Sequence, residues 1–303
     1  MAEKSRRERV TEMVRQAQNA ICSAFEEIDG AKTFESFTWE RPGGGGGTAR
    51  VMTDGAVFER AGVNVSAVEG SEVPPSIWQN RPQTKGHPYF ATGISMVVHP
   101  RNPYVPAFHA NYRYFEAGDD WWFGGGADMT PCYGFEEDAR HFHKTLKTFC
   151  DAFDPSYYPR FKETCDSYFF IKHRNEMRGV SGIFFDNLHL DGEDGWEKGF
   201  AFAQAGANAI LPSYMPIVER RKDTPYGERE RSWQLYRRGR YVEFNLVYDR
   251  GTVFGLQTNG NIEAILMSLP PLVRWEFNYK PEPGSREEEL VSKFLVPRDW
   301  ASE

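Results

Sequence analysis

The chain has 303 residues, of which 40% are hydrophobic, 15% aromatic and 26% charged, a composition that excludes an intrinsically disordered protein. Its formal net charge of −7 argues against a general nucleic-acid binder, because such a protein normally carries a basic face. No apolar run approaches the length needed to span a bilayer, so no transmembrane segment is expected.

The cysteines and the first residues bear on the cellular compartment. Cys22, Cys132, Cys150 and Cys165 form neither a C-x-x-C pair nor a zinc-knuckle spacing. The opening stretch MAEKSRRERV is charged and lacks the apolar region of a secretory signal. We therefore expect a cytoplasmic protein with free, structural thiols.

The first half of the chain begins with a helix and continues as strands. Apolar residues recur at helical spacing over residues 3–27, which predicts an N-terminal helix within residues 1–28. The glycine run at 43–47 lacks the Gly-Lys-Ser/Thr ending of a P-loop, which favours a flexible loop or lid over a phosphate site. Short strand-like runs separated by Pro and Gly follow to about residue 123.

The second half is predicted to be mostly helical. One helix runs from near Phe135 to Cys150, a second from about Pro159 to Ile171, and residues 195–239 are largely helical with the strand GIFFDNL before them. Residues 239–258, GRYVEFNLVYDRGTVFGLQT, are predicted to form a β-hairpin that turns at DRGT, followed by a short helix in NIEAILMSLP.

This order of elements contains no repeat, linker or steady alternation of strand and helix. It predicts one α+β domain over residues 1–303, with a large, mostly antiparallel β-sheet flanked on both sides by α-helices.

Two histidines, His99 and His109, lie in a strand-like stretch. Side chains alternate between the two faces of a strand. If the strands on either side of PRNPYVP pair, one sheet face presents Ser95, His99, His109, Asn111 and Arg113. Five hydrogen-bonding groups are too many for a buried core, which would have to satisfy each one. They fit the floor of a polar-lined cleft, with a solvated sheet face as the alternative.

Other polar residues lie near predicted element ends. Asp128 follows a triple glycine, where backbone can approach a ligand closely, although an exposed turn aspartate fits equally well. In the helix after Phe135, His143 lies at the margin of the apolar stripe and His141 nearer the surface. His173 and Arg174 end the next helix, where the macrodipole also favours cations.

The histidines His99, His109, His143 and His173 could bind a divalent metal cation, but their spacing is not diagnostic. The chain has no H-E-x-x-H, no G-x-G-x-x-G after a strand and no C-x-x-x-C-x-x-C cluster. No organic cofactor is therefore expected, and a metal ion stays open.

Long stretches of the sequence resemble the oxygen-dependent coproporphyrinogen III oxidases. They include GGGGGTARV, ERAGVNVS, HPRNPYVPAFHANYRYFE, WWFGGGADMTPCYGFEEDARHFH, YFFIKHRNEMRGVSGIFFDNL and EAILMSLPPLVRWEF. The resemblance runs from about residue 25 to PRDW near the end of the chain.

The resemblance implies an enzyme of heme biosynthesis. It would convert the propionates on rings A and B of coproporphyrinogen III to vinyl groups, with O₂ as co-substrate and CO₂ released, giving protoporphyrinogen IX. It also implies a broad antiparallel sheet flanked by helices, and a homodimer with residues 241–276 as the dimerisation segment.

The resemblance also implies roles for individual residues. It makes His109 the proton donor and assigns a metal to the four histidines. The implied substrate-binding residues are Ser95, Asn111, Tyr112, Arg113, Asn259, Gly260 and Asn261. Because the family usually has Arg where this chain has Asn261, Arg113, Arg174 or Arg250 would have to replace that cation.

A mechanistic hypothesis joins these residues. Asp128 would accept or polarise a pyrrole N–H and so help the ring to reduce O₂. The resulting peroxy species would take a hydrogen from the propionate, and His109 would deliver a proton. Two alternatives stay open: a metal-dependent oxygenase acting on another tetrapyrrole, and a non-catalytic tetrapyrrole carrier.

Overall fold

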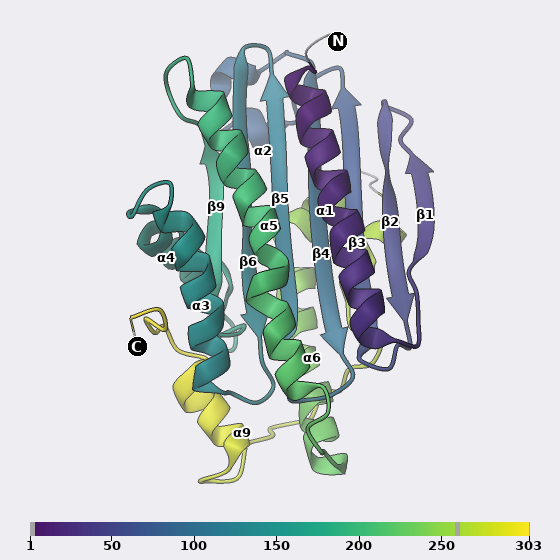
Figure 1. Cartoon of the computed structure of the whole chain (residues 1–303), viewed down its shortest axis with the longest axis vertical. Coiled ribbons are helices and arrows are strands. Elements are labelled where there is room, and N and C mark those ends of the chain that lie inside the picture. The colour runs from purple at the N-terminus through teal and green to yellow at the C-terminus, as the bar shows by residue number, and fades with distance from the viewer. Residues whose placement is uncertain (1–3, 258–260, 303) are drawn as a thin grey trace.

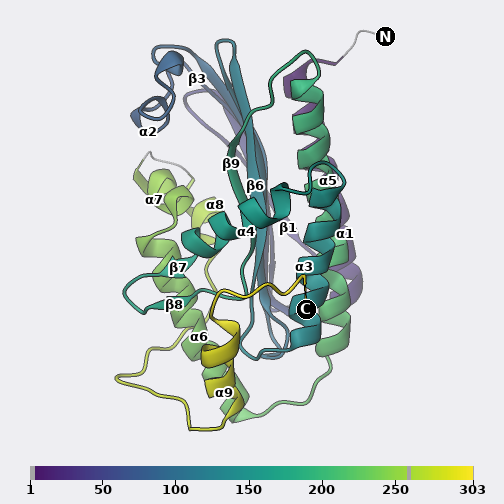
Figure 2. The same ribbon diagram turned by 90° about the vertical axis from the view of Figure 1, so that its left-hand side faces the viewer.

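The computed structural model describes residues 4–257 and 261–302. Its centre is a seven-stranded antiparallel sheet with the strand order β1-β2-β3-β4-β5-β6-β9. Helices cover both faces of this sheet (Figures 1 and 2). The predicted α+β class, with a large antiparallel sheet between helices, is confirmed.

Nine strands are present in the described residues, seven of them in the main sheet and two in a separate small ribbon. They are β1 (Glu35–Glu40), β2 (Gly45–Thr53), β3 (Phe58–Gly70), β4 (Tyr89–Pro100), β5 (Ala107–Ala117), β6 (Asp120–Thr130), β7 (Phe170–Ile171), β8 (Glu176–Met177) and β9 (Gly182–Leu188).

The helices range from single turns to 27 residues. They are α1 (Arg6–Asp29), α2 (Pro75–Trp78), the 3₁₀ turn η1 (Pro82–Thr84), α3 (Glu136–Asp151), α4 (Tyr157–Tyr168), α5 (Gly195–Arg221), α6 (Glu228–Val247), α7 (Arg250–Gln257), α8 (Ile262–Leu266), α9 (Arg286–Glu289) and the π-helical turn η2 (Leu290–Phe294).

The predicted N-terminal helix is confirmed as α1, and local signals define both of its ends. Ser5 and Glu8 form a capping box, and Gly30 ends the helix with a φ of 67°. Its buried residues recur at helical spacing and lie against β3 and β4.

One face of the sheet, which we call the packed face, is covered by α1, α3 and α5 (Figure 1). Even-numbered side chains of β5 point into it: Phe108 stacks on Tyr214 of α5, and Tyr114 contacts Trp196 at the start of that helix. Most of the large apolar side chains of the molecule are buried on this side.

The opposite face, which we call the polar face, lies toward α6, α7 and α8 (Figure 2). Odd-numbered residues of β5 and even-numbered residues of β6 point to it, because His109 pairs with Asp128 and Asn111 with Gly126. The α6–α8 layer covers part of this face, since Met267 lies against Gly62 of β3.

The predicted hairpin at 239–258 is wrong, because residues 239–247 lie in α6 and residues 250–257 form α7. Arg237, Tyr241, Phe244, Asn245 and the partly buried Tyr248 recur at intervals of three and four along one side of this segment. The aromatic and β-branched residues that suggested strands therefore also fit a helical period. Packing of α6 against β7 and Arg178, together with the ion pair of Arg237 with Glu176 of β8, selects the helix.

The predicted loop or lid at the glycine run is wrong for residues 45–47, which begin β2 and pair with β3, while residues 46 and 47 also pair with β1. Glycine is required there for space: a Cβ on Gly47 would lie 2.5 Å from the Trp39 ring, and Gly45 has a φ of 77°. Only residues 43 and 44 of the run lie in the turn between β1 and β2.

Candidate functional site

The polar face carries most of the side chains that were predicted to act on a ligand. Ser95 of β4 pairs directly with Asn111 of β5, and His109 and Arg113 lie two residues to either side of Asn111. Ser95 is exposed, while the other three are half-buried. The predicted sharing of one face by these residues is confirmed.

His109 is oriented by a carboxylate on the neighbouring strand. Its Nδ1 lies 2.8 Å from Oδ1 of Asp128. Because an ionised carboxylate only accepts hydrogen bonds, Nδ1–H is the donor. Within the described part of the chain, Nε2 is therefore the ring nitrogen left for a substrate.

Asp128 is in turn held by Arg178, which follows β8. Nη2 of Arg178 lies 2.7 Å from each oxygen of Asp128, and both side chains are only 2% exposed. Nη1 of Arg178 donates to Oδ1 of Asn245 at 2.9 Å, and the rings of Phe169 and Phe244 lie against the guanidinium. His109, Asp128 and Arg178 thus form one chain of charge-assisted hydrogen bonds.

The charges of the buried pair stabilise one another. Burial by itself would raise the pKa of Asp128, but Arg178 and the hydrogen bond from His109 outweigh it and lower that pKa. Burial likewise opposes the charge of Arg178, and Asp128 outweighs it and raises the pKa of the guanidinium. Asp128 is consequently a carboxylate that holds His109 in one tautomer.

Sequence reasoning missed Arg178, although a signal was present. Arg178 stands between Met177 and Gly179, shortly before the buried strand β9. A charged residue in such an apolar position needs an opposite charge.

The same geometry corrects the mechanistic role predicted for Asp128. Both of its oxygens are bonded to His109 and Arg178, and the side chain does not reach the exposed part of the polar face. In this arrangement it orients His109, and it is not free to accept a pyrrole N–H.

Arg113 presents a guanidinium on the polar face. Its Nη1 donates to Oδ1 of Asn111 at 2.6 Å, and its Nη2 donates to Asp186 of β9 at 2.9 Å. A Cβ on Gly124 would lie within about 3.0 Å of this guanidinium, so the triple glycine of β6 makes room for Arg113. The planar fork is suited to a carboxylate.

His99 shares the polar face but is buried under the α6–α8 layer. Its Nε2 lies 2.9 Å from the carbonyl oxygen of Ser268, and its ring meets the edge of Tyr241. Burial, with the nearby charge of Arg238, lowers the pKa of His99 to about 3. His99 is therefore a neutral residue that fixes the segment after α8.

The four histidines predicted to hold a metal do not converge. His143 of α3 lies on the packed face, where Tyr158 Oη donates to its Nδ1 and its Nε2 donates to the Val180 carbonyl, both at 2.9 Å. His173 is bonded to Glu243 and Tyr248. The described residues hold no cluster of three or more His, Cys, Asp or Glu side chains placed for a metal. The predicted four-histidine site is wrong, because the sheet separates His143 from the rest and other partners hold each ring.

Two further predicted substrate contacts, at Tyr112 and Arg174, differ from expectation. Tyr112 points into the packed face and is fully buried beside Gly206 and Phe185. Arg174 forms an ion pair with Glu243 at 2.6 Å, on the side of α6 opposite Tyr241 and Asn245. Neither side chain lies on the exposed polar face.

The predicted contacts in the turn before α8 are only partly visible. Asn261 caps α8, because its Oδ1 accepts the N–H of Ala264 at 3.1 Å. Asn259 and Gly260 lie outside the described residues.

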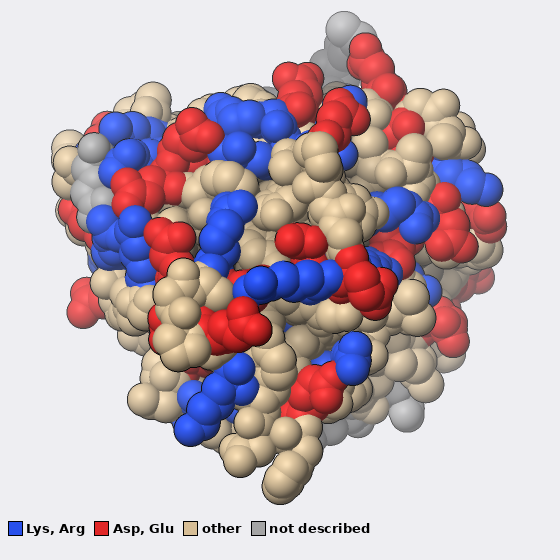
Figure 3. Space-filling model, turned by 90° about the horizontal axis from the view of Figure 1, so that it is seen from below, with Lys and Arg blue, Asp and Glu red and all other residues tan. Residues whose placement is uncertain are grey.

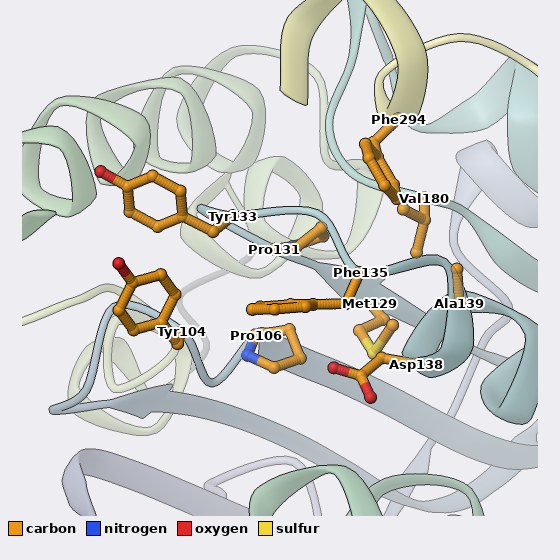
Figure 4. A pocket seen from close by; sticks show the side chains of 10 residues that line it. All are labelled: Tyr104, Pro106, Met129, Pro131, Tyr133, Phe135, Asp138, Ala139, Val180 and Phe294. Atoms are coloured by element: carbon orange, nitrogen blue, oxygen red, sulfur yellow. The ribbon is translucent and has the colours of Figure 1, made fainter. Parts of the chain in front are cut away.

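A small pocket elsewhere in the molecule is too small for a tetrapyrrole. It lies at the ends of β5 and β6 between α3 and the C-terminal segment, with Tyr104, Tyr133 and Phe135 on one side and Phe294 on another (Figure 4). Its cavity volume of about 10 Å³ accommodates one water molecule.

Comparison with known proteins identifies relatives over nearly the whole chain. The family model described as coproporphyrinogen III oxidase matches residues 9–300. The oxygen-dependent coproporphyrinogen-III oxidase of Parasynechococcus marenigrum (strain WH8102) is 57% identical, covering 97% of this chain and 87% of the relative. Those of Synechococcus sp. (strain CC9902) and Synechococcus sp. (strain CC9605) are 56% and 55% identical, each covering 97% of this chain and 87% of the relative. Given this identity and coverage, the chain belongs to the coproporphyrinogen III oxidase family.

Proposed function

We propose that this chain is an oxygen-dependent coproporphyrinogen III oxidase, which converts two propionates of its substrate to vinyl groups and yields protoporphyrinogen IX. The observation that carries the proposal is His109, held by the buried Asp128–Arg178 pair beside Ser95, Asn111 and Arg113. The relatives named above, more than half identical, support it.

Substrate binding is assigned to the exposed part of the polar face. Arg113 offers its guanidinium to a propionate, and Ser95 and Asn111 offer hydrogen bonds one strand apart. Asp186 already occupies part of the Arg113 fork at 2.9 Å, so a propionate would share or replace that ion pair.

The chemical balance of one decarboxylation requires a proton donor. The propionate loses CO₂ and a hydrogen from its β-carbon, and two electrons pass to O₂. Protonation of the reduced oxygen to hydrogen peroxide then uses that hydrogen and one further proton. His109 supplies this proton from Nε2, because its Nδ1–H is bonded to Asp128.

Asp128 and Arg178 act through His109 in this scheme. The carboxylate stabilises the imidazolium when His109 is protonated, and Arg178 keeps the carboxylate ionised and fixed. Neither residue needs to touch the substrate.

The domain organisation and the oligomeric state are also part of this proposal. The whole chain acts as one domain that assembles as a homodimer through residues 241–276. Exposed Leu246, Val247, Ile262, Leu272 and Trp275 in that region support this assembly.

A cytoplasmic location agrees with the four buried, free cysteines. Among the described residues, no helix has both the length and the apolar composition to cross a bilayer.

The direct test mixes the purified chain with coproporphyrinogen III without oxygen, in metal-free buffer, and then admits air. Vinyl product should appear only after air enters, with one O₂ consumed per vinyl group. Binding without oxygen consumption would instead support a tetrapyrrole carrier. Turnover that appears only after one divalent metal is added would support a metal-dependent oxygenase.

A further inference from the structure

The polar face extends beyond the residues assigned so far, toward β3. Asn64 of β3 pairs directly with Ser95, which pairs directly with Asn111. Partners in an antiparallel sheet point to the same side, so these three residues form one row across three strands. We call Asn64, Ser95 and Asn111 the amide row, after the two asparagine side chains at its ends.

The positions around the amide row are small. Ala49 pairs with Asn64 on the β2 side, and Gly126 pairs with Asn111 on the β6 side. In the next row, Ser66 pairs with Gly93. The row of Ser66 is bordered by the Trp39 ring above Gly47 and by the Arg113 guanidinium above Gly124. The small residues between these two larger side chains leave room for a broad, disc-shaped ligand.

Within this row, Asn64 has an unused acceptor. Its Oδ1 is buried and has no hydrogen-bond partner among the described residues. A buried acceptor without a donor is costly, and such atoms are rare in folded proteins. The carboxamide can turn about its broad terminal torsion to meet a ligand placed on the row.

The side-chain oxygens of Asn111 and Asp128 are already engaged. Oδ1 of Asn111 accepts from Arg113, and both oxygens of Asp128 are bonded to Arg178 and His109. A reduced tetrapyrrole carries four pyrrole N–H groups that donate and cannot accept. The acceptor that Asp128 was expected to provide is therefore absent from that position, and Asn64 offers one instead.

We propose that Asn64 accepts a pyrrole N–H of the bound tetrapyrrole and thereby sets the rotation of the macrocycle on the polar face. Two strand spacings, about 10 Å, separate Asn64 from the strand of His109 and Arg113. A macrocycle held near its centre by Asn64 places its rim, which bears the propionates, over those two residues. This role rests on the proposed function, because it takes the reduced tetrapyrrole as the ligand.

The test compares Asn64→Leu, which keeps the approximate size without an acceptor, with Asn64→Ser, which restores an oxygen. Asn208→Leu is the matched control, because Asn208 is exposed on α5 and lies on the other side of the sheet. Binding of coproporphyrinogen III is measured without oxygen by ultrafiltration, and the bound fraction is then oxidised to fluorescent porphyrin for quantification. In air, kcat, KM and the share of singly decarboxylated product are measured.

Asn64→Leu should raise both the anaerobic Kd and KM by about tenfold, as expected when a bound donor loses its acceptor. Its kcat should change far less, and more singly decarboxylated product should be released, because the ring is no longer held in one rotation. Asn64→Ser should recover most of the affinity, and Asn208→Leu should match the wild type.

A folded Asn64→Leu variant with wild-type Kd, KM and product ratio would overturn the role of Asn64. If that variant does not fold, Asn64→Ala provides the same comparison without adding apolar bulk. A wild-type chain that binds no coproporphyrinogen III would overturn the proposed function itself, so the two failures are distinguishable.

Discussion

At the scale of one residue, the proposed function makes Asp128 a buried charge that serves the reaction without touching the substrate. It is 2% exposed and bonded on both oxygens, so its influence passes through His109. Replacing it should therefore alter the protonation and orientation of that histidine more than the affinity for the substrate.

Asp128→Asn should lower kcat by about a hundredfold, within the range of general acid–base catalysis, and leave KM nearly unchanged. The kcat of His109→Ala should be similarly low. The kcat of the double variant should be little lower than that of either single variant, because the two residues act as a unit. Steady-state assays in air measure this. Additive losses in the double variant would show that Asp128 acts separately.

Asp128→Asn also leaves Arg178 buried without its counter-charge. We expect the free energy of unfolding to fall by about 3–5 kcal/mol, as for other broken buried ion pairs. Denaturant titration measures the change, and the kinetic assays should be run at a temperature where the variant stays folded. An unchanged unfolding free energy would mean that solvent reaches Arg178.

His143 provides a prediction about pH. Burial lowers its pKa to about 4 in the folded state, whereas an unfolded histidine titrates near 6.5. The unfolded chain therefore binds a proton first as pH falls, so the stabilising contribution is complete above pH 6.5 and declines toward pH 4.

Between pH 6.5 and 5, this one group should reduce the free energy of unfolding by about 2 kcal/mol. His143→Gln, which cannot titrate, should show a correspondingly shallower decline in denaturant titrations at several pH values. Equal pH dependence in the two proteins would indicate that the pKa of His143 is the same in the folded and unfolded states.

At the scale of elements, the glycine run is divided between a turn and a strand, and glycine has a different role in each. Gly43 lies in the turn, and a Cβ there would have its nearest neighbour at 3.8 Å. Gly47 lies in β2 beneath the Trp39 ring, where a Cβ would lie only 2.5 Å from that ring. Space above the strand, rather than backbone flexibility, explains the glycine at position 47.

Gly47→Ala should therefore destabilise the fold by about 1–3 kcal/mol, the usual range for overpacking. Gly43→Ala is the matched control in the same run and should change stability by less than about 0.5 kcal/mol. Thermal or denaturant unfolding compares the two. Equal effects would mean that Trp39 moves aside at little cost.

The α6–α7 region shows why local pattern alone misassigned an element. Its aromatic and β-branched residues are typical of strands, yet Tyr241, Phe244 and Asn245 lie on the helix side that contacts Arg178. That side becomes visible only when the residues it packs against, far away in the sequence, are in place.

At the scale of the whole molecule, the exposed apolar residues near α6–α8 point to assembly. Leu272 is 55% exposed and Phe277 fully exposed, in the segment that follows α8. Acidic and basic side chains are interspersed over the face seen from below (Figure 3). A concentration of exposed apolar residues in one segment is typical of an interface.

Leu272→Asp combined with Phe277→Asp should convert a dimer to monomers. Each substitution counts twice across a two-fold interface, so a loss of about 3 kcal/mol or more, roughly a hundredfold in Kd, is expected. Analytical ultracentrifugation over a range of concentrations measures it. Val296→Asp, at another exposed apolar position, is the control. A wild-type chain that is monomeric at all concentrations would contradict the proposed assembly.

The sequence by itself determined the sharing of one sheet face by Ser95, His109, Asn111 and Arg113, because strand alternation is a local property of the backbone. It also placed His143 at the buried side of its helix, since helical period is local as well. Only the tertiary structure decided that Arg178 meets Asp128 across 50 residues, that His143 lies on the opposite side of the sheet from His109, and that residues 239–247 and 250–257 are helical. These three features depend on residues that are far apart in the sequence and that together shield a side chain from water. The spacing of apolar residues within one segment does not show which distant residues those are.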